Sequence, residues 1–143
     1  MGTGRTLADV VAGVGNAIST YTQALDDGRS DDVVATFCPD GSCDMPGLGR
    51  HVGHAALRRA YDKWKPRQPQ RHLIVNTVVT KWDDHEAHAT SDMVFMIMGD
   101  RGWRVAIIGR YHDVLHAGDD TDVWRFHSRI AEFVEEANRE VDP

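Results

Sequence analysis

His72 is the histidine whose position in the sequence best suits acid–base chemistry. It stands near the start of a stretch rich in β-branched residues, where alternation places Ile74 on the same face of a strand. Both faces of that stretch are largely apolar, so we expect His72 to be buried or half-buried. Two interpretations follow. The bare pattern favours a structural hydrogen-bonding group, but imidazole also titrates near neutral pH, which suits a general base.

Asp26 is a second residue whose position is not explained by local structure. It falls with Asp27 in the last turn of a predicted helix, just before Gly28. Negative charge at that end opposes the helix dipole, at a cost of about 0.3–1 kcal/mol per exposed charge. Asp27 is interpreted as a solvated acid. For Asp26 the same interpretation is the simple one, but a locally unfavourable residue also indicates a role elsewhere.

The helices that would carry these residues are predicted from apolar spacing. Apolar residues at i, i+3, i+4 and i+7 predict a long helix over 7–25, and Gly28 supplies a left-handed stop. A short helix is predicted over 31–37. A third is predicted over 57–64, and Pro66 ends it.

The second half of the chain changes to the period of β-strands. Consecutive strands with short turns pair antiparallel, so helices followed by strands predict an α+β fold. The glycine-rich segment between the second and third helices is expected to be a loop with one short strand near Cys43. The chain, 1–143, is predicted to be one domain whose curved sheet and helices enclose a pocket. The predicted strands are 71–82, 86–98, 103–116 and 122–133.

Composition and charge argue against several classes of partner. The 143 residues include 16 basic and 22 acidic side chains, a net charge of −6. Nucleic acids and anionic membranes bind basic surfaces, so we expect neither as a partner. No apolar run is long enough to span a membrane, and the first residues lack a signal-type apolar stretch, which predicts a cytoplasmic protein. Cys38 and Cys43 are predicted to be reduced thiols.

No set of histidines, cysteines and acids has the sequence spacing of a metal site. His112 and His116 share one face of a predicted strand, but at i, i+4 a strand separates them too far to hold one ion. The sequence therefore predicts neither a metal nor another cofactor.

Several short stretches, in order and spacing, resemble the SnoaL-like branch of the nuclear transport factor 2-like superfamily. None is specific alone, but together they run from about residue 10 to about residue 130. The resemblance implies a cone of curved antiparallel sheet with three helices around one deep pocket, often as a homodimer. The stretches are YTQALDDG at 21–28, FCPDG at 37–41, GHAAL at 53–57, RHLIVN at 71–76, GRYHD at 109–113 and VWRF at 123–126.

Within that superfamily the chain looks closest to scytalone dehydratase and hexachlorocyclohexane dehydrochlorinase. Those enzymes use an Asp at the end of the first long helix and a His opening a strand, and the matching residues here are Asp26 and His72. The resemblance implies that His72 removes a proton from carbon while Asp26 holds and polarises the ring. Tyr21, on the inward stripe of the first helix, is a candidate acid or hydrogen-bond donor. The second pocket histidine of scytalone dehydratase is replaced by Ser91 or Asp92.

The resulting hypothesis is a cofactor-independent lyase or isomerase, foremost a dehydratase, acting on a small apolar cyclic or polyketide-like molecule. One alternative is a ligand-binding or dimerisation module of the same fold without turnover. Another is epoxide hydrolysis, which needs an Asp–Arg–Asp set that the sequence does not reveal. The apolar outer face formed by Leu73, Val75 and Val79 would suit a homodimer. The residues expected to contact the substrate are Asn76, Tyr111, Tyr61, Trp64 and Phe95.

Overall fold

A computed structural model describes residues 4–134, and its first element is a long helix, α1 (Leu7–Asp26). Thr6 and Asp9 form a capping box at its start, in which each side chain accepts from the other residue's backbone N–H. Beyond its end, Gly28 adopts φ 71°, in the left-handed region that favours glycine. The predicted helix over 7–25 and its glycine stop are therefore confirmed.

Two short helices, α2 (Ser30–Ala35) and α3 (His54–Lys63), pack against each other beside the end of α1. The sequence predicts that α2 continues to residue 37, but the chain has already entered a strand at Phe37. The third helix begins at His54, earlier than the predicted start at residue 57.

One six-stranded sheet, in the order β2-β1-β6-β5-β4-β3, forms the other layer. Neighbouring strands are antiparallel except β1 and β6, which run parallel. The last four strands agree closely with the predicted stretches. The strands are β1 (Phe37–Met45), β2 (Gly49–Val52), β3 (Gln70–Trp82), β4 (Glu86–Gly99), β5 (Gly102–His116) and β6 (Arg125–Phe133).

The sequence predicts that the segment between α2 and α3 is a loop with one short strand near Cys43. A strand does contain Cys43, but it is longer than predicted and pairs with β2 in a hairpin where a loop was expected. Pro39, Asp40 and Gly41 are residues typical of turns. Here they mark an irregularity inside β1, where the register with β6 shifts between Phe37 and Ser42. The two backbones approach so closely there that a Cβ on Gly41 would lie 2.6 Å from the Phe126 carbonyl oxygen. Glycine at this position therefore permits an irregular strand rather than a chain reversal.

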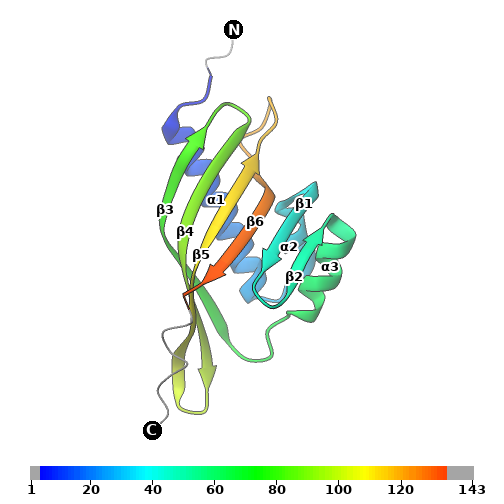
Figure 1. The fold of residues 1–143 in the computed structure, drawn as a ribbon, viewed down its shortest axis with the longest axis vertical. Helices are drawn as coiled ribbons and strands as arrows, with labels where there is room; N and C mark the ends of the chain where they lie inside the picture. Colours follow the sequence, from blue (N-terminus) through cyan, green and yellow to red (C-terminus); the bar gives the residue numbers. More distant parts are fainter. Residues whose placement is uncertain (1–3, 135–143) are drawn as a thin grey trace.

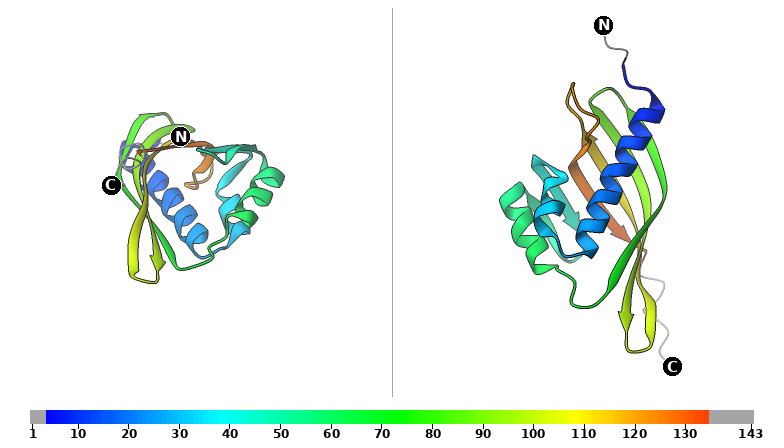
Figure 2. Two further views of the ribbon diagram at one scale, coloured as in Figure 1. Left: turned by 60° about the horizontal axis from the view of Figure 1, so that its bottom comes forward. Right: turned by 180° about the vertical axis from the view of Figure 1, so that it is seen from behind.

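The sheet curves around α1, which crosses its concave face, while α2, α3 and the β1–β2 hairpin close one side (Figure 1). Figure 2 shows the same enclosure from below and behind, with α1 packed chiefly against β3. Aromatic rings occupy the centre of the core, with centroids 5.4 to 6.1 Å apart. They belong to Tyr21, Phe37, Tyr61 and Phe126. The α+β cone predicted from the sequence is confirmed.

None of the helices within residues 4–134 combines the length and the apolar composition that crossing a membrane would need.

Candidate active site

Asp26 and His72 meet where the end of α1 passes the start of β3. The Nδ1 of His72 lies 2.6 Å from Asp26 Oδ1, and the His72 backbone N–H donates to Asp26 Oδ2 at 2.8 Å. The helix end delivers the carboxylate and the strand delivers the ring, so packing of α1 against β3 fixes their contact. These hydrogen bonds offset the unfavourable interaction between the Asp26 charge and the helix dipole.

Gln70 supplies a third hydrogen bond to the same carboxylate. Its Nε2 donates to Asp26 Oδ1 at 3.1 Å, and the residue is buried. Gln70 precedes His72 by two residues on β3, so both side chains point to the same face. The strand's alternation could have identified Gln70 from the sequence once His72 was placed.

The hydrogen bonds of Asp26 determine which nitrogen of His72 is available. An ionised carboxylate can only accept, so Nδ1 carries the proton of the 2.6 Å bond and Nε2 keeps a lone pair. The ring also stacks on Phe95, with centroids 4.4 Å apart. Only 12% of the His72 side chain and 5% of the Asp26 side chain are exposed. A fixed imidazole with a free nitrogen in a nearly dry setting is the arrangement of a general base.

The ring of His72 lies in the wall of a cavity of about 240 Å³. Helix, strand and hairpin residues all contribute to the lining, which is mostly aromatic or aliphatic. Such a space suits a compact apolar ligand with few polar groups. It is lined by Tyr21, Leu25, Met45, Leu48, Tyr61, Trp64, Gln70, His72, Met93, Phe95, Ile107, Tyr111 and Phe133.

Three buried phenols, those of Tyr21, Tyr61 and Tyr111, line the cavity. The hydroxyls of Tyr21 and Tyr61 lie 2.7 Å apart and share a hydrogen bond. Burial raises the pKa of Tyr21, Tyr61 and Tyr111 above the ordinary value of 10.0. All three therefore stay protonated at neutral pH. Because one hydroxyl of the Tyr21–Tyr61 pair donates to the other, the accepting hydroxyl is the one that keeps its proton for a ligand.

A buried ion pair that the sequence analysis missed lies behind these tyrosines. Arg129 on β6 donates to Asp113 on β5 at 3.0 and 3.3 Å, and neither side chain is exposed. The guanidinium carbon lies 3.6 Å from the ring centroid of Tyr111 and 4.4 Å from that of Tyr21. Burial alone would lower the pKa of Arg129, but the Asp113 carboxylate and the neighbouring tyrosines together outweigh burial, so the pKa is raised. The guanidinium of this pair thus packs against the rings of two tyrosines that line the cavity and holds them by cation–π interactions.

A family model described as the SnoaL-like domain matches residues 5–130, nearly the whole described chain. The chain belongs to the SnoaL-like domain family. No curated protein matches its sequence.

Solved structures similar to this SnoaL-like chain share its fold at low sequence identity. A protein from Catenulispora acidiphila, in complex with S-DNPA, has a TM-score of 0.80 at 23% identity, covering 91% of this chain and 97% of that one. An ntf2-like protein with a cystatin-like fold from Novosphingobium aromaticivorans has a TM-score of 0.80 at 16% identity, covering 90% and 84%. A candidate scytalone dehydratase from the same organism has a TM-score of 0.74 at 18% identity, covering 89% and 88%.

Among the residues expected to contact the substrate of this SnoaL-like chain, Asn76 lies outside the cavity. Its side chain is exposed and donates to Asp92 at 2.9 Å. Asn76 has φ 55°, and the register with β4 shifts between Val75 and Val78. This bulge changes the phase of alternation, so counting by twos from His72 fails at Asn76. The other four, Tyr111, Tyr61, Trp64 and Phe95, line the cavity.

The structure also bears on two further sets of polar residues: the position of the second pocket histidine, and the Asp–Arg–Asp set. Ser91 is the buried residue where a second pocket histidine would be sought, and its hydroxyl shares a 2.9 Å hydrogen bond with Thr77. Asp92 instead pairs with Arg110 on the outer face. Among the described acidic residues, Asp113 alone forms an ion pair with Arg129. Arg29 pairs with both Asp27 and Asp32, but these side chains are about half exposed and do not line the cavity. Among residues 4–134, no Asp–Arg–Asp set therefore faces the cavity, as epoxide hydrolysis would need.

Proposed function

We propose that this SnoaL-like protein is a cofactor-independent lyase or isomerase of the dehydratase type, in which His72 removes a proton from a carbon atom of its substrate. The observation that carries the proposal is the Asp26–His72 hydrogen bond on the wall of an apolar cavity. The family match and the fold shared with a candidate scytalone dehydratase support the same class of reaction.

The proposed reaction begins with transfer of a proton from carbon to Nε2 of His72. Asp26 stabilises the imidazolium that forms, because its carboxylate already accepts the Nδ1 proton. The electron pair of the broken C–H bond forms a double bond to the neighbouring carbon, and the C–O bond there breaks. The departing hydroxide takes the proton back from His72 and leaves as water, so no external acid is required.

Tyr21 is proposed to hold the substrate's oxygen rather than to give up its proton. Its raised pKa makes it a poor acid at neutral pH, but a neutral phenol in a dry cavity remains a good hydrogen-bond donor. When Tyr61 donates to Tyr21, whose hydroxyl lies 2.7 Å away, the proton of Tyr21 is left for the substrate. A substrate carbonyl placed there would stabilise the negative charge that develops as the proton leaves carbon.

The lining points to a small ring as the substrate. The cavity of about 240 Å³ is mostly aromatic and aliphatic, and His72 itself stacks on Phe95. A cyclic β-hydroxyketone of one or two rings supplies the required parts: an acidic C–H beside a carbonyl, a hydroxyl on the next carbon and an apolar body. The complex of the similar Catenulispora acidiphila protein with S-DNPA supports binding of a small molecule by this fold.

Hydrogen–deuterium exchange at carbon tests the proposal without knowledge of the natural substrate. We expect the wild-type protein in D₂O to exchange the α-proton of cyclic β-hydroxyketones, followed by proton NMR, and to release water from the best of them. His72→Ala should reduce both rates to the level without protein. His112→Ala is the matched control, because His112 lies on the outer face of β5 and bonds Glu132. Ligand binding without exchange would instead support a non-catalytic module.

We also propose that the outer face of the sheet forms a homodimer. Leu73, Val75, Ile108 and Ile130 lie on β3, β5 and β6 with 45% to 50% of each residue exposed. Val79, also expected on this face, instead packs against the core. Sedimentation velocity should show a dimer for the wild type and a monomer for Val75→Lys; a wild-type monomer at micromolar concentration would contradict the proposal.

A further inference from the structure

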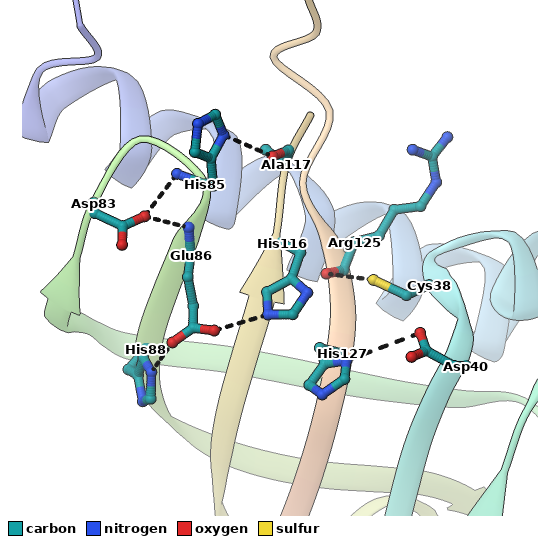
Figure 3. Close-up of polar contacts among 10 residues, drawn as sticks. All are labelled: Cys38, Asp40, Asp83, His85, Glu86, His88, His116, Ala117, Arg125 and His127. Atoms are coloured by element: carbon teal, nitrogen blue, oxygen red, sulfur yellow. Dashed lines mark hydrogen bonds and ion pairs between the residues drawn. The ribbon is translucent and has the colours of Figure 1, made fainter. Parts of the chain in front are cut away.

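A second cluster of reactive side chains lies at the opposite end of the sheet from the cavity. Cys38 stands at the start of β1, His116 at the end of β5 and His127 near the start of β6 (Figure 3). The cavity is lined at the other ends of the same strands, by residues such as Met45 and Phe133. The cluster shares no residue with the cavity, so it is independent of the proposed function.

Three metal-binding atoms converge in this cluster. One ligand atom from each of Cys38, His116 and His127 lies within 4.8 Å of the other two. Zinc bonds sulfur at about 2.3 Å and nitrogen at about 2.0–2.1 Å, which places tetrahedral donors about 3.4 Å apart. Closing around an ion therefore requires the donors to approach by at most about 1.4 Å, which side-chain rotation can supply.

A bulge in β6 brings His127 to the other two residues. Val114 pairs with Ser128 and Leu115 pairs with Phe126, so His127 is the extra residue between successive pairs. Bulges of this kind redirect a side chain and are common beside functional sites. The rings of His127 and His116 consequently stack, with centroids 4.4 Å apart and planes 16° apart. Coordination of one ion requires these planes to rotate away from each other.

His127 has the freedom to make that rotation. Its buried Nδ1 forms no hydrogen bond within residues 4–134, and the nearby Asp40 Oδ1 lies 4.0 Å away. A buried ring nitrogen without a partner is costly unless a ligand satisfies it. The sulfur of Cys38 makes only a weak contact, 3.6 Å from the carbonyl oxygen of Arg125. Both groups are thus available to an ion.

Glu86 provides the support that a metal-binding histidine usually has. Its Oε2 lies 2.9 Å from His116 Nε2, while its Oε1 lies 2.8 Å from His88 Nε2. A carboxylate on one ring nitrogen orients the imidazole and directs the other nitrogen, here Nδ1 of His116, toward a metal. Figure 3 shows Glu86 reaching across from β4 to both rings.

We propose that Cys38, His116 and His127 bind one zinc-type divalent ion. A thiolate and two imidazoles form the soft, nitrogen–sulfur donor set that zinc prefers over magnesium or calcium. Three protein ligands leave a fourth position for water or a small ligand. The ion joins β1 to β5 and β6 beside the irregular segment at 39–41. Sequence spacing could not predict this site, because the three ligands come from three strands that only the fold brings together.

Cobalt(II) titration of the full chain, stripped of metal with a chelator, tests the proposal. We expect one Co²⁺ per chain, a thiolate-to-metal charge-transfer band, tetrahedral ligand-field bands and displacement of Co²⁺ by Zn²⁺. Cys38→Ser should lose the charge-transfer band and bind at least about tenfold more weakly. Glu86→Gln should weaken binding by about 10- to 100-fold while the band remains.

His112→Ala is the control, because His112 lies on the same face of β5 as His116 and also bonds a carboxylate, but does not belong to the Cys38–His116–His127 group. Its affinity should equal that of the wild type. Should Cys38→Ser fail to fold by circular dichroism, His127→Ala replaces it, since 41% of that side chain is exposed. A wild-type protein without the thiolate band, or equal affinity in the wild type and the folded ligand variant, would overturn the proposal.

Discussion

Two carboxylates, each hydrogen-bonded to a nitrogen-containing side chain, lie under the same sheet and differ in what surrounds them. The Asp26–His72 pair forms part of the cavity wall, with 5% and 12% of the side chains exposed. The Asp113–Arg129 pair is enclosed completely, and three aromatic rings cover its guanidinium. The first pair joins α1 to β3, which are distant in sequence, whereas the second joins the consecutive strands β5 and β6. Of the two pairs, the first faces a space that a ligand can enter.

Whether each pair can transfer a proton depends on which of its atoms remain available to a ligand. Both oxygens of Asp26 accept hydrogen bonds from N–H groups of the protein. One of these groups is Nδ1 of His72, so Nε2 of the same ring is left for a ligand. Arg129 cannot release a proton at any physiological pH, and Asp113 directs both oxygens at it. The comparison separates a pair that can transfer a proton from a pair that only holds the fold together.

The largest expected effect is on stability, at the enclosed pair. Asp113→Ala leaves the Arg129 charge buried and uncompensated, and should lower the free energy of unfolding by about 3–5 kcal/mol. Urea denaturation measures this loss. Asp92→Ala is the control, because Asp92 forms an exposed ion pair with Arg110 on the same sheet and should cost little. Equal losses in the two variants would show that enclosure does not distinguish the pairs.

At the cavity pair the largest effect should be on turnover. Asp26→Asn keeps an acceptor for the His72 backbone N–H only by turning its amide N–H toward Nδ1. The ring must then carry its proton on Nε2, which removes the lone pair that acts as base. We expect deuterium exchange to slow by about 10²–10⁴-fold, the usual contribution of a general base, while the protein remains folded. Exchange within a few-fold of wild type would remove Asp26 from the mechanism.

The pH dependence of tyrosine ionisation tests whether the tyrosines between the two pairs are enclosed by the fold. All three tyrosines of the chain, Tyr21, Tyr61 and Tyr111, have pKa values raised by burial. Above pH 10, the ordinary value, the folded state binds more protons than the unfolded state, so stability falls as pH rises. Tyrosinate absorbance should therefore stay flat through pH 10 and appear only with cooperative unfolding. In guanidinium the same groups should titrate near pH 10; a similar curve without denaturant would contradict the burial.

The elements with a local pattern could be predicted from the sequence, and those that depend on a distant partner could not. The apolar period of α1 and the β-branched stretches of β3 to β6 reflect each element's own burial. By contrast, β1 contains few residues that favour strands, and glycine is needed at position 41 because the backbone there lies very close to β6. Asn76 was misplaced because a bulge, which no local pattern announces, reverses the side-chain phase of β3.

The candidate site divides in the same way. The meeting of Asp26 with His72 was implied by a family resemblance, because no periodic pattern links residues 46 positions apart. Arg129 and Asp113 were missed, although charged residues at inward positions of apolar strands are a signal that could have been read. The Cys38 cluster was missed because its members lie on three strands whose order in the sheet differs from their order in the chain.

The smallest expected effect belongs to Gln70, which sharpens the comparison because its side-chain amide donates to Asp26 and touches neither nitrogen of His72. Gln70→Leu removes one neutral donor from Asp26 Oδ1 and leaves the two bonds to His72 in place. A net hydrogen bond of about 0.5–1.5 kcal/mol corresponds to a loss of roughly 2- to 12-fold in kcat. Gln68→Leu, an exposed change two residues earlier, is the control and should leave kcat unchanged.

Gln70→Glu separates positioning from packing at the same site. It keeps the length of the side chain but places a carboxylate, which cannot donate when ionised, against Asp26. A like charge there should turn the carboxylate away from Nδ1 of His72, so kcat should fall further than in Gln70→Leu while KM changes less. If Gln70 served only to fill space, Gln70→Glu would be the milder variant. The order of the two kcat values therefore decides whether the hydrogen bonds of Asp26, and not the shape of the cavity alone, set up the base.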